Sequence, residues 1–178
     1  MKKNVIGLLF LGLISSACTA EACTAEASDL IKDVNVGMSG KQLVSKIQNV
    51  KHTTLEEDTD DLKVTTYEIS SKSDSEMISV TVADGVVHTI TYSHLLSNNI
   101  SRDLNELNQE VGDLLSRNLE FGDNSVKTNW QAVKDDSTGE VVFYEAELKS
   151  GGYVGYSVSQ NEGKTYMLKV CSLESLQS

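Results

Sequence analysis

Proline is absent from this chain of 178 residues. A proline-rich linker therefore does not divide it into separate domains. Basic residues are also scarce, because 15 Lys and Arg stand against 26 Asp and Glu and give a formal net charge of −11. Surfaces that bind nucleic acid are basic, as are segments that bind anionic membranes. The charge argues against both ligands and suits a basic protein partner.

The residues of metal sites and catalytic motifs are few. The chain has three cysteines and three histidines, without the Cys-x-x-Cys or His-x-x-x-His spacing of a metal site. The acidic pairs Glu56-Glu57, Asp60-Asp61 and Asp135-Asp136 stand in polar, turn-like stretches typical of solvated surface. We therefore expect a protein that is not an enzyme and has no cofactor or metal. An envelope enzyme without a recognisable motif is the alternative.

Long apolar runs are missing after the first residues of the chain. Lys2 and Lys3 precede an apolar run from Val5 to Ile14, and small residues follow it. This is the order of a secretory signal, whose apolar core has roughly 7–15 residues, whereas a membrane span needs about 20. The sequence predicts export, with residues 1–27 as signal peptide and linker.

The end of the signal can be read in two ways. Ser15-Ser16-Ala17-Cys18 resembles the lipobox of bacterial lipoproteins, although Leu usually stands where this chain has Ser15. The resemblance implies that the Cys18 thiol is acylated and that lipid anchors the protein at the outer membrane. Alternatively, cleavage after Ala22 or Ala27, each of which ends an Ala-x-Ala sequence, gives a soluble periplasmic or secreted protein.

The fate of Cys18 decides the state of the other two cysteines. An exported protein meets an oxidising compartment. If Cys18 carries lipid, Cys23 and Cys171 remain and could form a disulfide between the two ends of the domain. If the chain is cut after Ala27, Cys171 is a single thiol, either buried as a small apolar residue or reactive.

Residues 28–98 predict a first α+β unit. Ser39 and Gln42 have the spacing of a capping box, so a short helix begins after Ser39 and ends near Gln48. A polar stretch from Glu56 to Asp61 is interpreted as a loop.

About three strands follow this helix. The pattern predicts strands over Leu62–Ser70, Met77–Val82 and Val86–Tyr92. Val82 must oppose Val86 to bring the apolar residues of the last two strands to one face. We therefore expect Ala83-Asp84-Gly85 to form a three-residue loop rather than a two-residue Asp-Gly turn.

Residues 99–178 predict a second unit. Ser101 is expected to cap a helix that runs to Phe121, because Leu and Val recur at helical spacing along it. The four predicted strands that follow are Ser125–Lys134, Glu140–Lys149, Tyr153–Gln160 and Thr165–Ser172. The fold class is therefore α+β, with a helix and about three strands followed by a helix and about four strands. The strands form either two antiparallel sheets, each covered by its helix, or one continuous sheet.

One part of the sequence resembles a known family. Gly37-Met38-Ser39 leads into the short helix, and a strand pair ends in Val82-Ala83-Asp84-Gly85-Val86-Val87. This arrangement, from Val36 to Tyr92, resembles the small outer-membrane lipoproteins of the barrel-assembly machinery, whose fold is shared by the β-lactamase-inhibitory proteins. Where the family usually has Gly-x-Pro after the first helix, this chain has Gln48-Asn49-Val50. The resemblance implies a protein-binding role without catalysis.

Most aromatic residues lie in the second half, and one is a candidate anchor for a partner. Strand alternation places Tyr144 on the apolar face of its strand and Phe143 on the other face, beside Glu145 and Glu147. Phe143, Glu145 and Glu147 are therefore predicted partner-binding residues. The alternative is that the aromatics form cross-strand pairs and core.

These features predict a non-catalytic protein-binding module of the cell envelope, a lipoprotein of assembly-factor or inhibitor type. The alternative is an immunity protein or inhibitor that neutralises a basic toxin or hydrolase, which the acidity supports.

Overall fold

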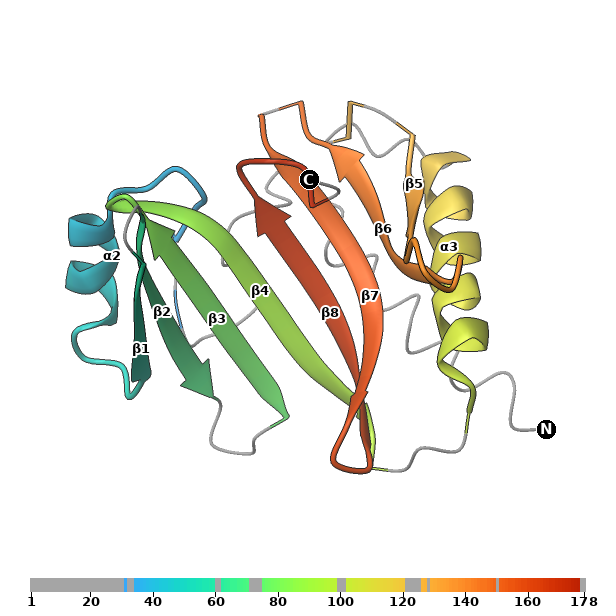
Figure 1. The fold of residues 1–178 in the computed structure, drawn as a ribbon, viewed down its shortest axis with the longest axis horizontal. Helices are drawn as coiled ribbons and strands as arrows, with labels where there is room; N and C mark the ends of the chain where they lie inside the picture. The colour runs from blue at the N-terminus through green and yellow to red at the C-terminus, as the bar shows by residue number, and fades with distance from the viewer. Residues whose placement is uncertain are drawn as a thin grey trace.

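A computed structural model describes residues 31, 34–59, 62–70, 75–98, 102–120, 126–127, 129–149 and 151–176. The predicted signal peptide, Cys18 and Cys23 lie outside the described residues. The described chain is α+β, and all of its strands belong to one antiparallel sheet with the order β1-β2-β3-β4-β8-β7-β6-β5 (Figure 1).

The chain runs through a helix and four strands, and then through a second helix and four strands. The first set is α2 (Gly40–Ile47), β1 (Thr53–Thr59), β2 (Leu62–Ser70), β3 (Glu76–Ala83) and β4 (Val86–Ser97). The second set is α3 (Leu104–Glu120), β5 (Gln131–Lys134), β6 (Val141–Glu147), β7 (Tyr153–Asn161) and β8 (Lys164–Ser172).

The two sets of strands join at the centre of the sheet. β8, the last described strand, lies beside β4 in the sheet (Figure 1). The register of the two strands includes Ile90 opposite Cys171. The expectation of two separate helix-and-sheet units is therefore wrong, and the alternative of one continuous sheet describes the fold. Two separate sheets would leave the backbone groups along one side of β4 and one side of β8 unpaired. Pairing β4 with β8 satisfies these groups and joins the two sets of strands into one sheet.

Both helices pack on the same face of this sheet. Gly40 of α2 lies over Val82, and Gly112 of α3 lies over Tyr144. The registers connect Val82 through β4, β8 and β7 to the face that carries Tyr144. One hydrophobic core lies between the helices and the sheet; its largest fully buried residues include Leu43, Ile47, Ile69, Ile78, Ile90, Leu115 and Leu148.

The capping box predicted at the start of α2 is confirmed. The Ser39 side chain accepts a hydrogen bond from the Gln42 backbone N–H at 3.3 Å, and the Ser39 N–H donates to Gln42 Oε1 at 3.2 Å. These bonds satisfy backbone donors that a helix start leaves without intrahelical partners. Leu43 and Ile47 then lie one turn apart and are buried against the sheet.

The turn between β3 and β4 differs from the predicted three-residue loop. Ala83 pairs with Val86, so the turn is the two-residue Asp84-Gly85, with φ of 50° and 76°. Both values lie in the left-handed region required by a type I′ hairpin turn. A register shift after Thr81 inserts an extra residue in β4 and restores Ile90 to the core face. Because of this bulge, a two-residue turn is compatible with apolar residues of both strands lying on the core face.

The acidic stretch predicted as a loop is largely the edge strand β1. Thr53 to Thr59 pair with Leu62 to Glu68 of β2 without a register shift. The side chains of Glu56 and Glu57 are exposed. An edge strand needs only backbone hydrogen bonds to one neighbour, so its side chains can stay polar and give no apolar alternation to detect.

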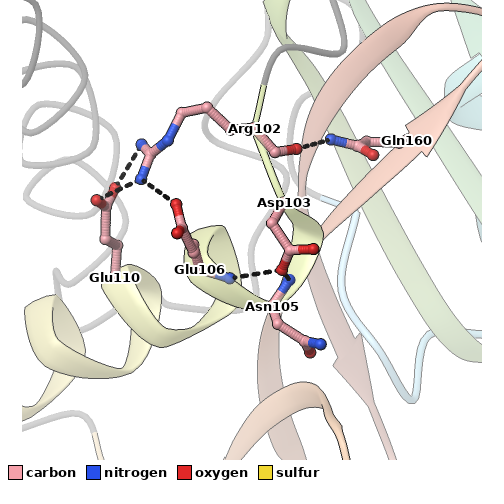
Figure 2. A network of polar contacts seen from close by, with 6 residues as sticks. All are labelled: Arg102, Asp103, Asn105, Glu106, Glu110 and Gln160. Carbon is pink, nitrogen blue, oxygen red and sulfur yellow. Dashed lines mark hydrogen bonds and ion pairs between the residues drawn. The ribbon is translucent and has the colours of Figure 1, made fainter.

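Asp103 caps α3. Its Oδ1 accepts hydrogen bonds from the backbone N–H groups of Asn105 at 2.9 Å and Glu106 at 3.3 Å (Figure 2). Ser101 lies outside the described residues. Arg102 reaches along the first turns of the helix and makes a bidentate pair with Glu110, at 2.9 and 2.6 Å. This pair raises the pKa of the Arg102 guanidinium.

The side chain of Asn108 joins α3 to two strands of the sheet. Pairing of β6 with β7 ends at Tyr144 and Tyr156. Beyond this point Asn108 Oδ1 accepts from the Val158 N–H at 2.9 Å, and Nδ2 donates to the Val141 carbonyl at 3.3 Å. The amide therefore satisfies backbone groups of strands that no longer pair, which explains a polar side chain that is only 2% exposed.

Candidate binding surface

No described helix lies on the second face of the sheet, which we call the open face. Side chains alternate along each strand, so the registers assign every described strand residue to one face or the other. Large side chains on the open face come mainly from the second half of the chain: Leu95, Phe143, Tyr153, Tyr166, Leu168 and Val170. All six are half-buried.

The centre of the open face is formed by three large residues of β8, which we call the central ridge. Tyr166, Leu168 and Val170 follow one another along β8. A serine stands on either side of Leu168, which pairs with Ser93 of β4 and with Ser157 of β7. The central ridge therefore offers apolar and aromatic contact area, and aromatic residues are enriched in protein interfaces.

The aromatic residues separate cleanly between the two faces. Tyr144 and Tyr156 oppose each other on the helix face, and Trp130 packs edge-on against Tyr156 at 5.5 Å between ring centroids. These three belong to the core or pack against it. Phe143 and Tyr153 belong to the open face. Neither the interpretation of the aromatic residues as core nor their interpretation as an exposed binding face accounts for all of them. One set forms core or packs against it, and the other lies on the open face.

The three predicted partner-binding residues lie together on the open face, but in different environments. Phe143 is half-buried, and Glu147 forms an ion pair with Lys127 at 2.6 Å. Glu145 is only 4% exposed. Its two carboxylate oxygens accept hydrogen bonds from the Ser175 hydroxyl at 2.7 Å and the Leu176 N–H at 2.5 Å. Glu145 is therefore occupied within the chain and holds its C-terminal segment.

This segment, residues 173–176, covers one part of the open face. Leu176 rests on Gly155, where a Cβ atom would lie 3.0 Å from Leu176 Cδ1 and 3.7 Å from the Phe143 ring. Gly155 thus makes room for Leu176 beside Phe143. Sequence reasoning misses this arrangement, because a glycine within a strand and a Ser-Leu pair in a polar tail carry no signal that they meet.

The described polar groups considered for catalysis or metal binding form hydrogen bonds within turns or lie apart from one another. Asp135 organises a turn, in which its Oδ1 accepts from the Ser137 hydroxyl at 2.5 Å and the Thr138 N–H at 2.8 Å. The Ser137 bond is the main cause that lowers the pKa of Asp135. In the part of the chain that the structure describes, no three His, Cys, Asp or Glu side chains are grouped to hold a metal ion. Neither described helix has the length and apolarity of a membrane span.

Cys171 lies in the centre of the sheet, on β8, and is completely buried. It is disulfide-bonded, and its partner is outside the described residues, as are Cys18 and Cys23. The reading of Cys171 as a single free thiol therefore does not describe this structure. Whether Cys23 is the partner remains a prediction.

Comparison with known proteins places the chain in no family. It matches no protein-family model, no curated protein and no solved structure.

Proposed function

We propose that this chain is an exported, non-catalytic protein-binding module of the cell envelope. The observation that supports this most directly is the open face. Its central ridge, Tyr166, Leu168 and Val170, is half-buried and has no described helix above it. Tyrosine is one of the residue types enriched among the residues that carry most of the binding energy in protein interfaces, which makes Tyr166 the candidate anchor of this ridge.

Lipidation at Cys18 and a periplasmic location complete the proposal. They rest on the N-terminal sequence alone, which lies outside the described residues. Labelled palmitate should be incorporated into the wild-type protein and not into Cys18→Ser. A mature N-terminus at Cys23 or Ser28 would instead indicate ordinary signal cleavage.

The binding function is tested by capture from envelope extract with matched surface variants. Leu168→Glu places a charge on the central ridge. Val44→Glu makes the same kind of change on α2, where Val44 is 46% exposed. We expect a partner that is retained by the wild type and by Val44→Glu but lost with Leu168→Glu, when circular dichroism shows all three proteins folded. A partner held equally by all three would show that the open face is not the binding surface.

A further inference from the structure

The two outer edges of the sheet, β1 and β5, differ in how far they are protected against pairing with another chain. An edge strand presents unpaired backbone N–H and C=O groups, and proteins blunt such edges with short strands, bulges, proline or charged side chains. β5 has four residues and a register shift at Val133 and Lys134. It is therefore short and irregular, as a protected edge is.

β1 is instead long and regular, and the protection that it carries is the charge of its acidic residues. It has seven residues, pairs with β2 without a register shift, and contains neither proline nor lysine. Thr53 to Glu57 are exposed, and Leu55 is 49% exposed, more than the other large hydrophobic residues of the described chain. The strand is long and regular enough to pair with an added strand along its whole length.

The charge of β1 decides which strand can be added. Two copies of β1 in antiparallel register about Glu56 would place Glu56 opposite Glu56 and Glu57 opposite Leu55. Like charges directly opposite each other destabilise a strand pair, whereas opposite charges contribute favourably. In this register the acidic side chains oppose self-pairing, and their charge favours a basic strand over a second copy of β1.

We propose that β1 is a docking edge that binds an extended basic segment of another protein by strand addition. This inference rests on the proposed binding function and names a second surface for it. Leu55 and Glu57 point to the open face with Thr66 and Val64 of β2, while Glu56 points to the helix face. The complementary segment places an apolar residue beside Leu55 and basic residues beside Glu56 and Glu57.

A synthetic peptide, Thr-Val-Thr-Val-Lys-Lys-Val-Thr, serves as the probe for this edge, because it places Val beside Leu55 and Lys beside Glu56 and Glu57 in either strand orientation. Binding is measured by titration calorimetry at low salt on the full mature chain. Hydrogen exchange at the β1 amides should slow when the peptide binds, because outward N–H groups gain partners. A second peptide, with the same charges but with alternate backbone nitrogens methylated, cannot pair with the edge and should not bind.

Charge-reversal variants locate the contact. Glu56→Lys with Glu57→Lys should weaken peptide binding by about tenfold or more, since it turns two attractive cross-strand pairs into repulsive ones. Asp136→Lys with Glu140→Lys makes an equal change of net charge next to β5, where both residues are exposed, and should leave binding nearly unchanged.

Three results would overturn the proposal. They are equal binding of the methylated peptide, equal weakening by both double variants, and dimerisation of the wild-type chain through β1 that the peptide cannot compete with. A partner captured from envelope extract that binds Glu56→Lys/Glu57→Lys as well as wild type would refute the edge while leaving the binding function intact. Loss of all capture by the wild type would instead refute the function.

Discussion

Gly112 lies where α3 packs against Tyr144 of β6. A Cβ atom at this position would overlap the ring of Tyr144, so the helix can lie this near β6 only without a side chain there. Glycine within a helix usually costs stability relative to alanine. Here the close packing of α3 on β6 and β7 offsets that cost.

Gly112→Ala should therefore destabilise the protein, by about 1–3 kcal/mol, although alanine favours the helix. Chemical denaturation followed by circular dichroism measures the free energy of unfolding. In a Tyr144→Ala background the ring is gone, and Gly112→Ala should become neutral or stabilising. A loss of equal size in both backgrounds would contradict this account of the glycine.

Tyr92 carries a hydroxyl group that is buried without a hydrogen-bond partner among the described residues. Its ring lies on the helix face of β4, with the Lys169 ammonium 5.5 Å from the ring centroid. A buried donor without a partner destabilises the fold by about 1–3 kcal/mol. Tyr92→Phe keeps the ring and removes this cost, so unfolding at neutral pH should require the same or more denaturant than in wild type.

The same tyrosine predicts a loss of stability at alkaline pH. Burial raises the pKa of the Tyr92 hydroxyl well above its usual value of about 10. Above about pH 10 the tyrosine of the unfolded chain loses its proton while that of the folded chain keeps it. The free energy of unfolding therefore falls as pH rises through this range. The decline between pH 9 and roughly 11, measured by urea denaturation, should be shallower in Tyr92→Phe. Parallel declines would mean that other groups control this range.

At the scale of secondary-structure elements, α2 depends on its capping box. Ser39→Ala removes the side-chain acceptor of the Gln42 N–H and should lower the free energy of unfolding by about 0.5–2 kcal/mol. Ser45 provides the matched control, because its hydroxyl donates only to the Gln42 carbonyl within the same helix. Ser45→Ala should be neutral, and equal losses for the two variants would argue against the cap.

Local signals in the sequence predict α2, β2 and the last two strands well, because capping spacing and alternation each depend on a few neighbouring residues. They fail where a distant contact decides the outcome. β1 is polar and forms because β2 offers it an edge. The two-residue turn at Asp84-Gly85 is compatible with the core only through the bulge after Thr81. The contact of Glu145 with Ser175 and Leu176 likewise joins residues far apart in the chain.

The molecule as a whole is built from two halves with the same plan. From each outer edge of the sheet to its centre, the four strands of a half follow one another in chain order. Both helices lie on the same face of the sheet. The halves share one core and are joined by the long pairing of β4 with β8. They should therefore unfold together as a single cooperative unit.

Ile90→Ala tests this cooperativity, because Ile90 lies in the first half, fully buried, opposite Cys171 of the second. Truncation should cost about 2–5 kcal/mol. Trp130 is the only tryptophan of the chain and reports on the second half. Its fluorescence transition should shift together with the far-ultraviolet circular dichroism signal. A tryptophan transition that does not move would indicate two halves that unfold independently.

The position of β8 also governs the order in which the fold can be completed. A ribosome delivers the chain from its N-terminus, so β4 emerges long before β8, the strand that pairs with its inner edge. During that interval β4 is a twelve-residue strand with one unpaired edge and with Val87 and Ile90 ready for burial. Pairings between residues so distant in sequence form slowly. The nascent first half is thus the species most exposed to aggregation, and a factor that holds it unfolded until β8 arrives would raise the yield of folded protein.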